Sequence, residues 1–272
     1  MGFDEKDQNV ETDIEKVDLQ LNEDEVGITF IDLTSGEATL IQHGNGQNIL
    51  INNGGPETEH ELKKVLQMFD VQKIDMLIIT SDDEQYIANT QFLIENYHIK
   101  KYITGQQILL KSQLKQKLNV VKWDVWTTND HFELLPELFV DVLHDYNVPT
   151  KPIGLDFRIQ FHDTVLLYMT SSDKNVEQKL MKTNLQDVNI LKVSHFADER
   201  GSSKTFIDHV DPQVAIIFRK KNEWPSQAVI ERLYQTWIDI YPTKQFGNIS
   251  IKLNKNSYEV IPISYESASF VP

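Results

Sequence analysis

The sequence has no cysteine among its 272 residues. This absence excludes disulfides, thiolate metal ligands and a cysteine nucleophile. No apolar run approaches the roughly 18 residues that a membrane-spanning helix needs. The first six residues, Met-Gly-Phe-Asp-Glu-Lys, have neither the basic region nor the apolar core of a signal peptide. We therefore expect a soluble chain without a transmembrane segment, in a compartment that the sequence leaves open, including an extracytoplasmic one if a leader has been removed.

Basic residues are also scarce: 26 oppose 41 acidic residues, for a net charge of −15. Residues 1–25 hold ten acidic residues and two lysines, a net of −8, so the remaining residues carry −7. We predict that residues 1–25 form an acidic flexible tail and that residues 26–272 form a single domain. Nucleic-acid binding usually begins with a basic stripe. None is present, so a nucleic-acid partner is disfavoured and the expected partner is an unidentified protein or small ligand.

Common local motifs are missing as well. The eight histidines form no H-x-H or H-x-x-x-H pair, and there is no G-x-x-x-x-G-K-[ST] or G-x-G-x-x-G run. Spacing alone therefore predicts neither a metal motif nor a nucleotide-binding loop. A Ser-His-Asp triad has no support either, because a triad is identified by geometry.

Hydrophobic residues make up 40% of the chain, which is enough for one large core, and they recur with the periods of strands and helices. Apolar segments and turns predict strands over 26–33, 37–43, 47–51, 74–80, 101–104, 120–127, 133–135, 138–144, 155–161, 164–170, 188–193, 214–218, 248–253 and 258–263. Helical spacing predicts helices over 58–69, 82–97, 107–118, 173–183, 203–210 and 226–238. Two strand-rich stretches bordered by helices predict an α/β fold with four αββα layers.

Six segments, in order, resemble the metallo-β-lactamase superfamily, in particular the soluble domain of the competence protein ComEC and its free-standing relatives. The segments are F-I-D-L-T-S-G-E-A at 30–38, I-L-I-N-N-G-G at 49–55, M-L-I-I-T at 76–80, L-L-Y-M-T-S-S at 166–172, L-K-V-S-H-F at 191–196 and W-P-S at 224–226. The resemblance covers residues 26 to about 255. It implies a four-layer metallo-β-lactamase-like sandwich with a metal cleft.

The residues that bind metal in that family are replaced here. The family's H-x-H-x-D-H motif falls on Ser81, Asp83, Gln85 and Tyr86, and its bridging aspartate falls on Ser172. The remaining matched positions are Asn52, His195, Phe196, Trp224 and Ser226, of which only His195 keeps a family ligand type. A catalytic zinc site normally has three protein ligands. We therefore predict a vestigial cleft with degenerate metal motifs, no cofactor and no catalytic residue.

Two function hypotheses follow from this resemblance. The first is a pseudoenzyme, a non-catalytic member that acts as a binding or scaffold module. The alternative is a metal-dependent hydrolase of phosphodiesterase or nuclease type, with zinc or manganese held at an atypical site by Asp83, His195 and unrecognised ligands. Metal-free hydrolysis by polar residues of a rebuilt site is a third hypothesis.

Several segments admit a plain structural interpretation beside a functional one. Residues 81–84 predict a capping box, with Ser81 as the N-cap, rather than a cation site. Residues 52–55 predict a turn with positive φ rather than an anion cradle. His195 is either a relic hydrogen-bonded near the core or a contact for a new ligand. Trp224 either stacks on a ligand or is buried over the former metal pocket.

Overall fold

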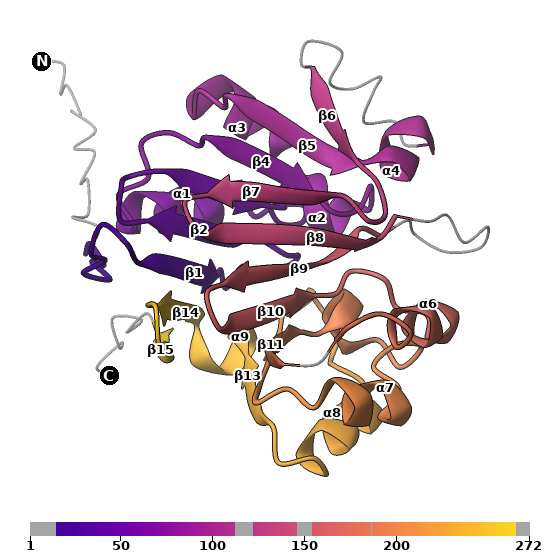
Figure 1. The fold of residues 1–272 in the computed structure, drawn as a ribbon. Helices are drawn as coiled ribbons and strands as arrows, with labels where there is room; N and C mark the ends of the chain where they lie inside the picture. Colours follow the sequence, from indigo (N-terminus) through magenta and orange to yellow (C-terminus); the bar gives the residue numbers. More distant parts are fainter. Residues whose placement is uncertain (1–14, 112–121, 146–153, 186, 265–272) are drawn as a thin grey trace, which may run out of the picture.

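The computed structural model describes residues 15–111, 122–145, 154–185 and 187–264. Its strands form two sheets that lie face to face, with helices on the outer faces (Figure 1). The expected αββα layers are confirmed. Within the described ranges no helix is both long and apolar enough to cross a membrane.

The first sheet has eight strands in the order β15-β14-β1-β2-β3-β4-β5-β6. They are β1 (Val26–Phe30), β2 (Thr39–His43), β3 (Asn48–Ile51), β4 (Met76–Ile79), β5 (Lys101–Gly105), β6 (Trp123–Trp126), β14 (Asn248–Leu253) and β15 (Tyr258–Ile263). The predicted meander is present, because β1, β2 and β3 pair antiparallel. From β3 to β6 the pairing is parallel.

The second sheet has seven strands in the order β13-β12-β11-β10-β9-β8-β7. They are β7 (His131–Leu135), β8 (Leu138–His144), β9 (Asp156–Phe161), β10 (Thr164–Tyr168), β11 (Val188–Lys192), β12 (Val214–Ile217) and β13 (Asp239–Pro242). The hairpin expected around His162 and Asp163 joins β9 to β10. The strands β10 to β13 run parallel.

The helices are α1 (Glu59–Met68), α2 (Glu84–Ile87), α3 (Thr90–Asn96), α4 (Gln106–Lys111), α6 (Lys174–Leu180), the 3₁₀ turn η1 (Ser194–Ala197), α7 (Lys204–Val210), α8 (Gln227–Tyr234) and α9 (Thr243–Phe246). Most of the helices sit where the period of the apolar residues places them, whereas the short η1 and α9 were not predicted. On α1, Leu62, Val65 and Leu66 form one buried face. The predicted end of the 107–118 helix lies outside the described residues.

Two sequence predictions were wrong in detail. The helix expected over 82–97 is split into α2 and α3, and its N-cap is Asp83 rather than Ser81, because the Asp83 carboxylate accepts the backbone N–H of Gln85 at 2.8 Å. The helix expected to reach Ile238 ends at Tyr234, and the chain then forms the short strand β13, which the pattern did not predict. Local propensity does not distinguish these cases, since the tertiary position of the chain decides them.

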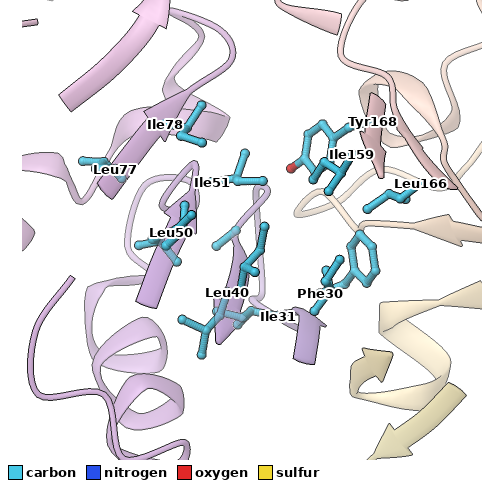
Figure 2. Packing of buried hydrophobic residues seen from close by; sticks show 14 of the residues in the cluster. Phe30, Ile31, Leu40, Leu50, Ile51, Leu77, Ile78, Ile159, Leu166 and Tyr168 are labelled. Carbon is cyan, nitrogen blue, oxygen red and sulfur yellow. The ribbon is translucent and has the colours of Figure 1, made fainter. Parts of the chain in front are cut away.

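The core has two parts. The larger fills the space between the sheets and under the helices of the first sheet, and the smaller lies between the second sheet and α6, α7 and α8. Figure 2 shows Ile51 of the first sheet on the side that faces Ile159 and Tyr168 of the second. This inter-sheet layer positions the loops at both sheet edges.

The predicted acidic tail is only partly within the described residues. Residues 1–14 lie outside them, so the expected mobility there stays a prediction. Residues 15–25 lie against the domain: Val17 donates its N–H to the Met68 carbonyl at 2.9 Å, and Val17 and Leu19 pack against the core. The boundary expected at residue 25 did not anticipate these contacts.

Substitution of Leu77 tests the packing of the first sheet. It is fully buried on β4, whereas Leu110 on α4 is 66% exposed. We expect Leu77→Ala to lower the free energy of unfolding by about 2–5 kcal/mol, because it removes buried methyl groups and leaves a cavity. The matched Leu110→Ala should change it by about 0.5 kcal/mol or less. Urea denaturation of both variants measures the difference, and equal effects would contradict this packing.

Candidate functional site

The loops that carry the predicted cleft residues meet at one edge of the sandwich. Asn52 follows β3 and Ser81 follows β4, while Ser172 follows β10 and His195 follows β11. Each of these strands belongs to the parallel part of its sheet, and parallel strands deliver their carboxyl ends to the same edge. An antiparallel bridge between Ser81 and Gly154 joins the two halves. The structure therefore gathers most of the predicted site residues in one region.

Asn52 is a buried structural residue. It has φ 59°, as predicted for this turn, and no exposed surface. Its side-chain oxygen accepts the backbone N–H of Thr80 at 2.9 Å, and its amide donates to the Thr80 hydroxyl at 2.9 Å and to the Tyr168 hydroxyl at 3.4 Å. Thr170 donates in turn to Thr80 at 3.0 Å. The amide therefore joins β3, β4 and β10 through polar groups that satisfy one another.

The positions matching the family's first metal motif make local contacts. The Ser81 hydroxyl accepts the N–H of Asp83 at 3.3 Å, and Asp83 caps α2. The Gln85 side-chain oxygen accepts the Ser35 hydroxyl at 2.5 Å. These groups order the loop that leads into α2.

Tyr86 and His195 belong to a buried polar chain across the two sheets. The Tyr86 hydroxyl donates to Glu37 at 3.3 Å and lies 3.1 Å from His195 Nδ1. Glu37 forms an ion pair with Lys192, and both side chains are fully buried. Lys192 also donates to the Met169 carbonyl at 2.8 Å and lies 4.7 Å from the Tyr168 ring centroid. A buried charge is expensive unless it is paired, so each half of this ion pair depends on the other.

Burial is the main influence on the pKa values of these four side chains. It raises the pKa of Glu37 to about 7, although Lys192 favours the charged carboxylate. Burial likewise lowers the pKa of Lys192 and raises that of Tyr86 well above its usual value. The pKa of His195 is lowered by burial, against the attraction of Asp83 and Asp198. His195 therefore favours its neutral form.

The other matched positions are divided between core and surface. Phe196 is buried and packs on Tyr86 with ring centroids 5.8 Å apart. The Ser172 hydroxyl donates to Asp198 at 3.3 Å, and Asp198 is also held by Arg200 at 2.7 Å. Trp224 is 77% exposed, so it is not buried over the cleft. The resemblance predicted that these residues lie near one another, but it did not predict how exposed each side chain is.

A further polar cluster at this edge was missed in the sequence. His144 at the end of β8 binds Asp156 through Nδ1 at 3.0 Å, and both are buried. Asp156 accepts the backbone N–H groups of Thr170 and Ser171 at 2.6 and 2.8 Å. Burial opposes its ionisation, but the hydrogen bonds from His144 and Ser171 together lower its pKa. The only signal was a histidine at a strand end, without local motif spacing.

A pocket of about 300 Å³ lies beside this buried chain. Its lining includes His195, Phe196, Asp198, Lys220 and Trp224. Three consecutive lining residues, His195, Phe196 and Ala197, have φ of 39°, 57° and 59°. His195 links the pocket to the buried Tyr86 and Glu37 through its hydrogen bond to the Tyr86 hydroxyl.

The described residues do not fit the paired-metal centre that the resemblance implies. Within these parts of the chain no group of three or more His, Asp or Glu side chains is arranged to hold a metal ion. At the matched positions, Asp83 caps a helix and His195 Nδ1 faces a tyrosine. A zinc site requires several such donors within about 2.0–2.2 Å of one ion.

Two curated proteins are similar to this chain in sequence. The chain is 22% identical over 258 residues to ComE operon protein 3 of Bacillus subtilis, covering 83% of this chain and 33% of the relative. It is 24% identical over 253 residues to Recombination protein 2 of Haemophilus influenzae, covering 89% and 30%. The chain thus spans about a third of the length of these curated relatives. No family model matches the sequence.

Solved structures show which fold the chain has. The metallo-β-lactamase fold protein YhfI from Bacillus subtilis superimposes with a TM-score of 0.60 and 13% identity, over 85% of this chain and 100% of that one. The diiron β-hydroxylase CmlA from Streptomyces venezuelae gives 0.54 and 10%, over 89% and 55%. The chain therefore has the metallo-β-lactamase fold, and its similarity to ComEC-like proteins is confirmed.

The Glu37–Lys192 pair makes a double-mutant prediction. We expect Lys192→Met to lower the free energy of unfolding by about 3–5 kcal/mol, because it leaves Glu37 buried without its cation. The double variant Glu37→Leu with Lys192→Met should recover most of that loss, since neither charge is then buried alone. Urea denaturation of the two single variants and the double variant measures the coupling. Additive losses would contradict a buried ion pair.

The same pair predicts a pH dependence. In the unfolded chain Glu37 titrates near its usual value of about 4.3, and in the folded protein its pKa is about 7. The folded state therefore binds more protons between these values, and its stability falls as the pH rises through that window. Glu37→Gln leaves Lys192 without its anion, and its stability deficit relative to wild type should be smaller at pH 8 than at pH 5. Urea midpoints at both values test this, and an unchanged difference between the two proteins would oppose it.

Proposed function

We propose that this chain is a non-catalytic binding module of the metallo-β-lactamase fold that takes its ligand in the pocket beside His195. The observation that carries the proposal is the use of the polar groups at the matched metal positions. They are held by the protein itself, in the Asn52, Asp83 and Tyr86 contacts described above. Side chains committed to one another would have to break these bonds to hold a cation.

The form of the contacts supports this proposal. Asn52 is an amide, and Tyr86 is a phenol whose pKa burial raises well above the usual value. Neither group is a ligand that zinc commonly takes, because zinc prefers imidazole, thiolate and carboxylate. Ser172, where the family has a bridging aspartate, is hydrogen-bonded to Asp198. The donor chemistry and the bonding pattern both favour a cleft maintained as structure.

The strained turn at residues 195–197 supports a retained binding role. Left-handed backbone costs roughly 1–2 kcal/mol for each residue other than glycine. Three such residues occur in succession here, and all three line the pocket. Strain of this kind persists where the surroundings enforce it, and it concentrates at ligand clamps and active sites.

The second candidate is a metal-dependent hydrolase with an atypical zinc or manganese site. One observation favours it: the carboxylates of Asp83 and Asp198 both act on His195 and favour its charged form. A histidine and two carboxylates that interact with it electrostatically could begin a metal-binding set. Asp198 would have to leave Arg200, which holds both its oxygens, and Asp83 could offer only the oxygen that does not cap α2. The binding module requires no such rearrangement.

Metal analysis separates the two candidates. We expect protein purified in buffer containing zinc and manganese to retain well under one equivalent of either metal after gel filtration. We also expect no chelator-sensitive hydrolysis of bis-p-nitrophenyl phosphate or single-stranded DNA. The contrary outcome is a stoichiometric metal and a chelator-sensitive rate, both lost in His195→Ala. His60→Ala is the matched control, because His60 is an exposed histidine on α1.

A further inference from the structure

The pocket beside His195 combines aromatic faces with hydrogen-bond acceptors. Phe196 and Phe218 are buried, while Trp224 is largely exposed. Asp198 and Glu199 add two carboxylates to the lining. An aromatic face and a carboxylate share one preference in ligand chemistry, because each attracts a positively charged group.

His195 presents an acceptor as well, by the logic of its hydrogen bonds. Glu37 in its ion pair with Lys192 is a carboxylate that only accepts, so the Tyr86 hydroxyl donates its hydrogen bond to Glu37. The Tyr86 oxygen then accepts from His195 Nδ1–H, 3.1 Å away. We assign this tautomer from the bonding pattern. The other ring nitrogen, Nε2, then keeps its lone pair and can accept a hydrogen bond from a ligand.

The charges that line the pocket are mostly negative. Asp198, Glu199 and Glu223 are lining carboxylates, and Lys220 is the one cation among the lining residues that the structure describes. Lys220 is already paired with Glu223 at 2.7 Å. Asp198 is likewise paired with Arg200, so Glu199 is the lining carboxylate that remains to repel an anionic ligand. A cation would meet attraction.

Trp224 already holds a cation within this molecule. The Lys244 ammonium lies 3.1 Å from the centroid of its ring. Lys244 itself is not a lining residue of the pocket, and 77% of Trp224 remains exposed. The indole therefore has surface left for a second positive group.

We infer that this pocket binds an alkylammonium or guanidinium group, with Trp224 as the stacking wall and Glu199 and His195 as acceptors. The inference rests on the proposed function and names the chemistry of its ligand. A volume of about 300 Å³ is at the lower end of the range for ligand pockets. It admits a free polyamine, or one lysine or arginine side chain of a peptide.

Calorimetric titration tests the inference with two cationic probes, spermidine and a short arginine-containing peptide, and one anionic probe, inorganic phosphate. We expect saturable binding of at least one cationic probe and none of phosphate. Trp224→Ala should weaken the binding by about three- to thirtyfold, the range of a cation–π contact. Trp224→Phe should restore part of it. The probe that binds more tightly identifies the source of the cation.

Matched controls separate this site from general attraction to an acidic protein. Trp224→Ala leaves the net charge unchanged, and Trp237→Ala removes a tryptophan that is 96% exposed and does not line the pocket. Glu199→Gln should weaken binding more than Glu84→Gln, which removes the same charge from an exposed residue on α2. Equal effects within each pair would overturn the cation site. Saturable phosphate binding at this pocket would overturn the ligand class and leave the binding module intact, whereas chelator-sensitive turnover would overturn the proposed function itself.

Discussion

The cleft depends on one buried ion pair between the two sheets. Glu37 precedes β2 of the first sheet and Lys192 ends β11 of the second, and neither side chain has exposed surface. Taking two charges out of water costs several kcal/mol for each ion, so the pair requires close approach and additional partners. Met169 and Tyr86 supply those partners. The positions of Tyr86 and His195 then follow from the position of the pair.

The metallo-β-lactamase fold does not decide what this cleft does. YhfI and CmlA share its layers at 13% and 10% identity, which establishes the fold alone. Function resides in the side chains that a fold presents at its loops. Here those side chains bond to one another at the edge where the parallel strands end. The difference between a metal centre and a binding pocket is therefore a difference in donors and not in topology.

The layers could be predicted from the sequence because hydrophobic period is a local property. Most strands and helices were found in this way, including the hairpin between β9 and β10. The site was only partly predictable. His144 and Asp156 are 12 residues apart and Tyr86 and His195 are 109 apart, so only the tertiary fold brings each pair together. The exposure of Trp224 was equally invisible, because a tryptophan beside a proline fits either environment.

The buried pair has a consequence for specificity as well as for stability. An apolar core tolerates a small slide of one sheet over the other, since dispersion contacts lack direction. An ion pair with two additional hydrogen bonds does not, because a shift would leave charges buried without partners. Glu37 and Lys192 thus fix the register between the sheets at the edge where the pocket lies. His195 inherits that register through Tyr86, and for this reason a pocket built on loops has a defined shape.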